Sequence, residues 1–316
     1  MFKVTNEFRE SVLEELMVRY EIYERTDKMF ARKWAIPETS FNSLKTKFKN
    51  GLKGYSSLLS EMKWIGLGRA LGVYSRTRKW NTAETDVFLA MRQELMFCKE
   101  ESRSMIFCDD ADIGKTETAK VLAATLPETY HIDCSRAKSK GEFLRLIARE
   151  IGLPIAKKDR HADIFDTIVY GLSHFDRPLV ILDEAGDLSD SAFLEIKALW
   201  NATEHSCGWY AMGAEGFAAK LERGFDNKKL GIAEFLRRFG AKISTIVPKD
   251  AKTKQQFYRK LITQVLLANM KDEEKPLLDK IVNQCLANHG QDRMGCLTRA
   301  ENLLIVYTRP EASVKK

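Results

Sequence analysis

The chain has 316 residues and a formal net charge of +7, and 44% of its residues are hydrophobic, enough for one large domain with a sizeable core and a smaller second one. No apolar run approaches the about twenty residues of a membrane span, and no signal peptide opens the chain, so we expect a soluble, cytoplasmic protein without a membrane partner. The six cysteines occur singly, which argues against disulfides and cysteine-bound metals.

Basic charge is concentrated near the N-terminus. Residues 1–80 contain 16 Lys and Arg against 9 Asp and Glu, whereas the rest of the chain contains 35 of each. Within Lys28–Lys79 the ratio is 12 basic to 2 acidic residues. This imbalance is typical of a module that meets nucleic-acid phosphates, although a solvated basic face would have the same composition.

A helix-turn-helix pattern lies inside this basic region. Residues 26–34 and 38–49 are predicted helices, joined by a turn at Ala35-Ile36-Pro37. Ala31 is small enough for the two helices to approach closely. The apolar residues of the second helix recur at helical spacing and predict a buried stripe of Phe41, Leu44 and Phe48.

The outward-facing residues of these two helices are candidates for DNA contact. Small hydroxyl and amide side chains near a helix start suit base edges, and lysine or arginine suits phosphates. A plain structural helical hairpin is the alternative interpretation. The candidates are Arg32, Lys33, Thr39, Ser40, Asn42, Lys45 and Lys47.

The middle of the chain alternates between strand and helix patterns, which predicts an α/β fold: a parallel sheet with helices on both faces. The predicted strands are 104–108, 129–133, 178–183, 208–213 and 242–247, with helices at 84–99, 115–125, 139–151, 190–204 and 214–222.

Beyond Pro248 the pattern is wholly helical, and helices are predicted at 252–269, 276–289 and 292–307. The predicted organisation is a helical helix-turn-helix domain at residues 1–75, a nucleotide-binding core at 76–248, a helical lid at 249–309 and a tail at 310–316.

A phosphate-binding loop follows the first predicted strand. Backbone N–H groups and the Lys115 ammonium would hold phosphates, and the Thr116 hydroxyl would ligate Mg²⁺. The pattern GxxxxGK[ST] begins here at Asp109 instead of glycine, and Asp110 and Asp112 follow. Three carboxylates beside a triphosphate repel it unless they point outward, so we expect slow nucleotide use. The candidate nucleotide ligands are Asp112, Ile113, Gly114, Lys115, Thr116 and Glu117.

The third predicted strand ends in Asp183-Glu184. Asp183 would hold the same Mg²⁺ through water, and Glu184 would activate the attacking water. Gly-Lys-Thr is a common tripeptide and buried strands often end in an acid, so either motif alone is weak. Their order and spacing together predict an ATP site. The histidines pair with no cysteine or carboxylate at ligand spacing, and we assign them no chemistry.

These features together resemble the AAA+ ATPases, and within them the DNA-transposition ATPases typified by the target-selection protein B of phage Mu. The resemblance implies ATP and Mg²⁺ as cofactors and slow hydrolysis stimulated by DNA or a partner. It implies a bacterial or phage-encoded protein that assembles with itself on double-stranded DNA, as a ring or filament, and delivers that DNA to a transposase.

The resemblance also implies roles for arginines. The segment Phe235–Phe239 looks like the one that presents an arginine finger to a neighbour's nucleotide, with Arg238 preferred and Arg237 close behind. Solvated arginines at a helix end are the alternative. Arg293 is similar to the sensor-2 arginine of the lid, although Arg299 could serve instead.

Two further sites follow from the resemblance. The sensor-1 position holds Gly213-Ala214, so Glu215 is the nearest polar candidate. The segment after the second strand would face DNA, where Arg136, Lys138 and Lys140 could contact phosphates.

Two other functions fit the same sequence. A helicase loader would share the core but act on a helicase and favour single strands. A DNA-binding regulator would bind nucleotide as a switch without turnover.

Overall fold

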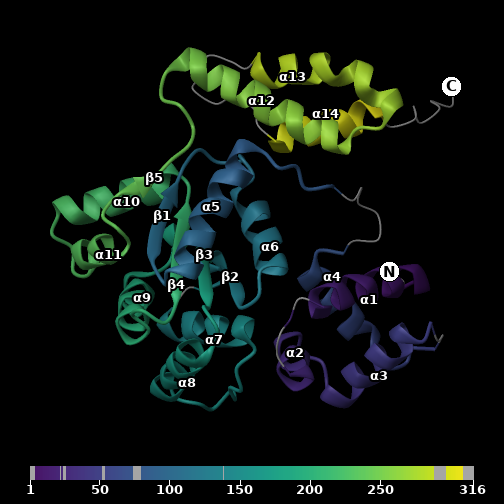
Figure 1. The fold of residues 1–316 in the computed structure, drawn as a ribbon, viewed down its shortest axis with the longest axis vertical. Coiled ribbons are helices and arrows are strands. Elements are labelled where there is room, and N and C mark those ends of the chain that lie inside the picture. The colour runs from purple at the N-terminus through teal and green to yellow at the C-terminus, as the bar shows by residue number, and fades with distance from the viewer. Residues whose placement is uncertain are drawn as a thin grey trace.

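The structure is a computed structural model that describes residues 4–21, 23, 26–51, 54–73, 80–137, 139–287 and 297–308. Its central sheet carries helices on both faces, and one helical group lies toward each end of the chain (Figure 1). None of the helices in these ranges combines the length and the apolarity that a bilayer crossing requires.

Five parallel strands form the sheet in the order β2-β3-β4-β1-β5. Both β3 and β4 are buried along their whole length, as expected for inner strands of a sheet covered on both faces. The predicted α/β fold is confirmed. The strands are β1 (Ser104–Cys108), β2 (Thr129–Asp133), β3 (Leu179–Asp183), β4 (Gly208–Gly213) and β5 (Ile243–Ser244).

The last strand is shorter than the predicted 242–247. After Ser244 the backbone N–H groups of Ile246 and Val247 donate to the carboxylate of Asp109 instead of a neighbouring strand. The Asp109 side chain therefore takes the place of the backbone hydrogen bonds that would continue β5.

Two helical layers cover the sheet. One face carries the short 3₁₀ turns η1 and η2 and the helices from α7 to α11, and the other carries α5 and α6. These elements are α5 (Asp86–Glu100), α6 (Lys115–Thr125), η1 (Cys134–Arg136), α7 (Lys140–Ile151), α8 (His161–His174), η2 (Ala185–Asp187), α9 (Asp190–Ala202), α10 (Glu215–Asp226) and α11 (Ile232–Arg238).

The C-terminal helices form a lid over the carboxyl edge of the sheet (Figure 1). Their buried side chains join the same hydrophobic cluster as those of α5 and α6, so the lid packs on the core through apolar contacts. The lid consists of α12 (Ala251–Asn269), η3 (Asp272–Leu277), α13 (Leu278–Leu286) and α14 (Leu297–Thr308).

The N-terminal helices have a hydrophobic cluster of their own. Helices form at both positions of the predicted pair, and Ala31 and Ile36 are buried. Phe41 and Leu44 are buried too, but the prediction was wrong for Phe48, which is 41% exposed because the last turn of its helix extends past the cluster. The helices are α1 (Asn6–Glu21), α2 (Asp27–Lys33), α3 (Glu38–Lys49) and α4 (Glu61–Leu71).

The N-terminal helices touch the core where α2 meets α7. The ammonium of Lys33 lies 5.8 Å from the ring centroid of Tyr23 and 5.3 Å from that of Tyr130 on β2. Burial lowers the pKa of Lys33 to about 8. Gly152 ends α7 with φ of 82°, and a Cβ there would lie 3.0 Å from the Met29 carbonyl oxygen. The end of α7 therefore lies close to the backbone of α2, and a side chain at position 152 would crowd it.

Candidate nucleotide-binding site

The loop between β1 and α6 has the form of a phosphate-binding loop. Gly114 has φ of 94°, and Asp112 takes the left-handed conformation with φ of 60°, which Asp tolerates better than most residues. Lys115 is 7% exposed, and its Nζ donates to the carbonyl oxygens of Asp109 (3.0 Å) and Asp110 (2.5 Å). Burial lowers the pKa of Lys115. The ammonium is thus held inside the loop, beside the space that phosphates would take.

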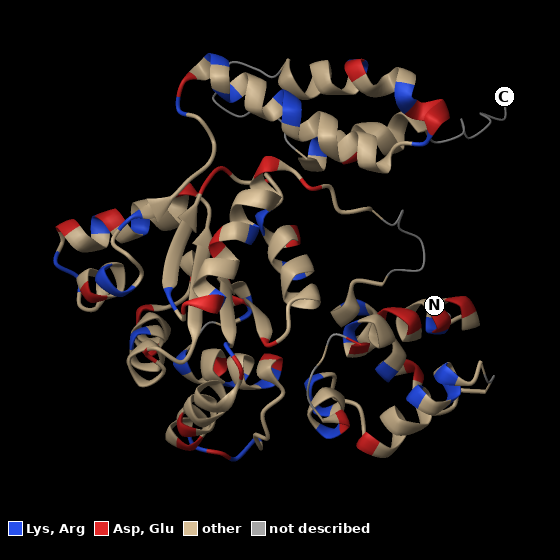
Figure 2. Ribbon diagram, viewed as in Figure 1, with Lys and Arg blue, Asp and Glu red and all other residues tan. Residues whose placement is uncertain are grey.

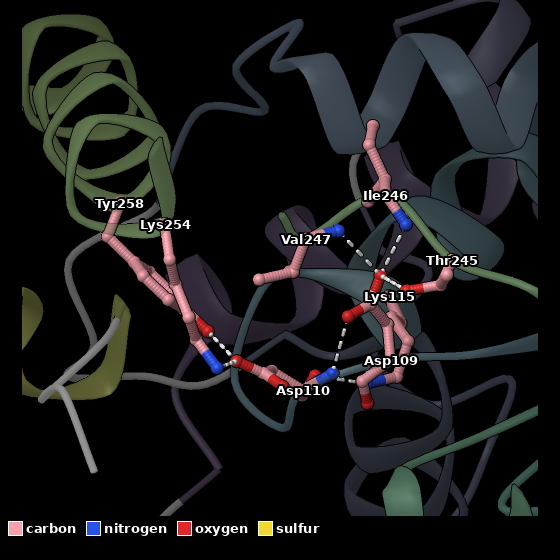
Figure 3. A network of polar contacts seen from close by, with 8 residues as sticks. All are labelled: Asp109, Asp110, Lys115, Thr245, Ile246, Val247, Lys254 and Tyr258. Carbon is pink, nitrogen blue, oxygen red and sulfur yellow. Dashed lines mark hydrogen bonds and ion pairs between the residues drawn. The ribbon is translucent and has the colours of Figure 1, made fainter. Parts of the chain in front are cut away.

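The carboxylate of Asp109 turns away from the loop. It is 4% exposed, and its Oδ2 accepts hydrogen bonds from the Thr245 hydroxyl (2.9 Å) and from the backbone N–H of Ile246 (2.6 Å) and Val247 (3.0 Å) (Figure 3). Its Oδ1 accepts from the N–H of Asp110 at 2.8 Å. Asp109 therefore joins the loop to the chain that leads into the lid.

The other two loop aspartates contact the lid itself. Asp110 accepts from Lys254 and Tyr258 on α12 (Figure 3), and Asp112 accepts from the backbone and hydroxyl of Thr298 on α14. Each of the three carboxylates thus has at least one oxygen held by the lid or by the chain that leads into it. Each has structural partners that a glycine could not have.

The acidic pair lies at the end of β3, at the same edge of the sheet. Asp183 is 3% exposed, and its Oδ1 accepts from the N–H of Glu184 at 3.0 Å. Glu184 has φ of 51°. Burial and the neighbouring charges of Asp183 and Asp187 raise the pKa of Glu184, while Lys115 acts in the opposite direction. Lys115 and Glu184 are therefore close enough to interact electrostatically.

The structure adds a contact that sequence spacing did not indicate. The imidazole Nε2 of His131, to which the sequence analysis assigned no chemistry, lies 2.9 Å from Oδ2 of Asp183. The partners are 52 residues apart in the chain and become neighbours because β2 pairs with β3, with His131 opposite Ile181. The strand β2 reads Thr-Tyr-His-Ile-Asp, so a polar residue at position 131 did not stand out in the sequence.

A comparison with protein families gives a match at this part of the chain. A family model described as "AAA domain" matches residues 86–221, from the first residue of α5 into α10. Residues 86–221 form an AAA domain. The matched segment includes both the phosphate loop and Asp183-Glu184. No curated protein matches the chain.

The AAA domain offers a donor set that suits Mg²⁺. The ion prefers hard oxygen ligands and keeps several waters. Thr116 opens α6 beside Lys115, and Asp183 keeps its carboxylate at the sheet edge. Burial is the main cause of the raised pKa of Glu184, and the charges of Asp183 and Asp187 add to it, so negative charge gathers where a dication would offset it. Thr116 and Asp183 therefore fit the ion, and Ile113, buried at 1%, and exposed Glu117 flank the loop.

The two candidate finger arginines, which follow the matched segment, differ in their surroundings. Arg238 lies folded onto its own chain, where Nε donates to Asn201 Oδ1 (2.7 Å), NH1 donates to the Glu234 carbonyl (3.0 Å), and the guanidinium lies 5.4 Å from the Trp200 ring centroid. Arg237 is exposed, with no hydrogen bond or ion pair to any part of the chain that the structure describes. The geometry favours Arg237 as the arginine available to a neighbour.

The sensor candidates are only partly placed. Glu215 begins α10 and interacts with Asp110 and Lys254, so it lies beside the loop. Arg293 falls outside the described residues. Arg299, the alternative, lies on α14 directly after Thr298, which Asp112 holds.

The predicted DNA-contacting residues of the N-terminal helices fall into two groups. Figure 2 shows Lys and Arg on both α2 and α3. Lys33 turns toward the core, Lys45 pairs with Asp27, and Lys47 donates to the Gly54 carbonyl, so these ammonium groups have partners within the chain. The outward group consists of Arg32, Thr39 and Asn42, which are exposed, and Ser40, which is half-buried.

The second predicted DNA segment lies at η1 and the start of α7. Arg136 is exposed, whereas Lys140 forms an ion pair with Glu195 at 2.6 Å. Lys138 falls outside the described residues. Arg136 is thus the cation of this segment that the structure leaves open to a phosphate.

Proposed function

We propose that this protein is an ATP-dependent DNA-binding ATPase that assembles on double-stranded DNA and delivers it as a target to a transposase. One observation supports the nucleotide part above all others: buried Lys115 and the pair Asp183-Glu184 meet at one edge of a parallel sheet. A lysine in a helix-opening loop beside two strand-end carboxylates is the arrangement that phosphoryl transfer to water requires.

Each residue has a defined task in this proposal. Lys115 exchanges its carbonyl partners for phosphate oxygens, and the N–H groups at the start of α6 bind the same phosphates. Thr116 and Asp183 would hold Mg²⁺, which neutralises charge on the phosphates when bound. His131 positions the Asp183 carboxylate through its Nε2.

Glu184 takes the proton of the attacking water. A carboxylate with a raised pKa is a better general base near neutral pH than an ordinary one. Burial is the main cause of the rise, and the Asp183 charge adds to it. The left-handed backbone of Glu184 sets its side chain apart from that of Asp183.

Assembly and DNA contact are supported by surface residues. Arg237 is free to approach a neighbour's phosphates, and a finger donated in trans makes hydrolysis depend on assembly. Thr39 and Asn42, at the exposed start of α3, suit a DNA groove, and Arg136 suits phosphates. Loss of the γ-phosphate would then loosen the assembly and release DNA.

Nucleotide binding is tested by calorimetry with ATP and Mg²⁺. Lys115→Ala should abolish binding, because it removes the buried ammonium. Lys120→Ala is the matched control, since Lys120 is an exposed lysine of the same helix and should bind as the native chain does. Equal binding by all three proteins would refute the site.

DNA assembly is tested by electron microscopy of the chain with linear double-stranded DNA, in ATP, ADP or no nucleotide. Rings or filaments that form only with ATP support the proposal. Isolated particles at discrete sites, indifferent to nucleotide, would instead indicate a regulator, and preference for single strands would indicate a helicase loader. Phosphate release with and without DNA then measures turnover.

A further inference from the structure

The phosphate loop is tied to the lid by an ion pair and a hydrogen bond at Asp110. Its Oδ2 lies 2.7 Å from Lys254 Nζ and accepts from the Tyr258 hydroxyl at 2.5 Å (Figure 3). The side chains of Asp110 and Lys254 are 19% and 27% exposed, and Tyr258 is buried. Both partners belong to the N-terminal half of α12. This tie is partly sheltered from water and joins the loop directly to α12.

A second tie joins the same loop to α14. Asp112 Oδ2 accepts from the Thr298 N–H (2.9 Å), and Oδ1 accepts from the Thr298 hydroxyl (2.7 Å). The Asp112 carbonyl also accepts from the N–H of Leu297 at 3.4 Å. Two aspartates, two residues apart in the loop, therefore hold two different lid helices.

The peptide groups of this loop also hold Lys115. Its Nζ is bonded to the carbonyl oxygens of Asp109 and Asp110, the residues whose side chains reach the lid connection and the lid. When Lys115 turns to a phosphate, the Asp110 carbonyl loses its donor. Because the carbonyl and the carboxylate belong to one residue, a displacement of the Asp110 backbone on phosphate binding would be passed to the partners of its side chain.

The tie pairs the negative charge of Asp110 with the positive charge of Lys254. Burial alone would raise the pKa of Asp110, but the hydrogen bonds from Lys254 and Tyr258 outweigh it and hold the pKa below its usual value. The bond to Asp110 raises the pKa of Lys254 in turn. Asp110 is thus ionised and paired at neutral pH, and the tie persists under ordinary conditions.

We infer that Asp110 is a positioning residue that couples occupancy of the phosphate loop to the position of lid helix α12, with Asp112 making the same link to α14. The inference rests on the proposed nucleotide binding at Lys115. By linkage, whatever the lid contacts can then alter nucleotide affinity, and nucleotide can alter what the lid contacts. This gives the carboxylates of Asp110 and Asp112 a role in a loop that also holds Lys115.

Amide hydrogen exchange of α12 in the full chain tests the coupling, with and without saturating ADP and Mg²⁺. In the native protein we expect exchange at residues 251–260 to change about fivefold or more on binding, the low end of usual allosteric couplings. In Asp110→Asn, which keeps the side-chain shape but loses the charge, the change should fall below about twofold. Lys254→Met removes the ammonium that pairs with Asp110. The ADP-dependent change in exchange should fall in this variant as it does in Asp110→Asn.

The matched control is Asp86→Asn. Asp86 opens α5 and forms a lid–core ion pair with Lys260 on the same α12, at the same 2.7 Å, without touching the loop. This variant should keep the native response to ADP. A native-sized response in Asp110→Asn and Lys254→Met would overturn the coupling.

The two proposals fail in different ways. If calorimetry shows no nucleotide binding by the native chain, the proposed function and the coupling both fall. If ADP binds but exchange in α12 does not change, only the coupling falls. Loss of the response in Asp86→Asn as well would also overturn it, since any weakened lid contact would then suffice.

Discussion

The imidazole of His131 and the carboxylate of Asp183 lie 2.9 Å apart and join two neighbouring strands of the sheet. The contact occupies one oxygen of Asp183 and leaves its other oxygen on the N–H of Glu184. The orientation of the Asp183 carboxylate, the candidate Mg²⁺ ligand, is therefore set from β2, a strand that carries none of the predicted catalytic residues.

His131→Ala should weaken Mg²⁺ use. Loss of a group that orients a metal ligand costs about 10- to 100-fold in metal affinity or activity. We expect the Mg²⁺ concentration for half-maximal ATP turnover to rise by about that factor. His205→Ala, at an exposed histidine that lies beside Glu204, is the control. An unchanged Mg²⁺ titration would show that His131 has no positioning role.

Asp109→Gly should destabilise the lid connection although it restores the common loop pattern. The change removes the acceptor of the Ile246 and Val247 N–H groups. Leaving such buried donors unpaired costs about 1–3 kcal/mol each. Urea unfolding and exchange of these two amides should show the loss. Asp166→Ala, at an exposed aspartate, is the control and should change neither the urea unfolding nor the exchange of these amides. If Asp109→Gly is as stable as the native chain and its two amides exchange as slowly, Asp109 does not have this role.

Turnover should fall at acid pH because of Glu184. Burial, and then Asp183, raises its pKa above 4.5, so the base protonates and turnover is lost at a higher pH than for an ordinary glutamate. The folded state binds this proton more tightly than the unfolded state, so ionisation on raising the pH lowers stability. Glu184→Gln should therefore raise Tm of the nucleotide-free chain at neutral pH and abolish turnover.

The Tm gain of Glu184→Gln should shrink as the pH falls through the raised pKa of Glu184, where the native carboxyl is itself protonated. Glu222→Gln, on α10, is a control whose Tm difference should stay near zero at all pH values. A pH-independent gain would indicate a packing effect instead.

Arg237 and Arg238 should behave differently. Arg237→Ala should lower DNA-stimulated turnover on the order of a thousandfold, as loss of an arginine finger does, with unchanged Tm. Arg238→Ala should lower Tm, because it removes the contacts with Asn201 and Trp200. Mixing inactive Arg237→Ala with inactive Lys115→Ala should restore part of the turnover, since each supplies what the other lacks. No recovery in the mixture would argue against a finger in trans.

Arg136→Ala should weaken DNA binding without regard to sequence. Removal of one phosphate contact should reduce the slope of log affinity against log salt by about 0.9. Lys157→Ala, at an exposed lysine of another loop, is the control and should keep the native slope. A native slope in Arg136→Ala would exclude this segment from the DNA surface.

Much of the fold could be predicted from local pattern. The helix Lys115–Thr125 and the strands Ser104–Cys108 and Thr129–Asp133 were predicted to the residue, because apolar runs and glycine punctuation are local signals. The predicted strand at 242–247 was too long, because its end is paired by a side chain 137 residues away in sequence. No local signal reports such a partner.

The sequence by itself determined the alternation of elements, the phosphate loop at Lys115 and the acidic pair at Asp183, since these depend on residue type, order and spacing. Only the tertiary structure decided what the loop carboxylates do. In the sequence, Asp109, Asp110 and Asp112 are three negative charges beside a phosphate site; in the fold, each points to a partner from the lid or its connection. Charge is a property of the residue, but the direction of a side chain depends on the donors that distant segments bring to it.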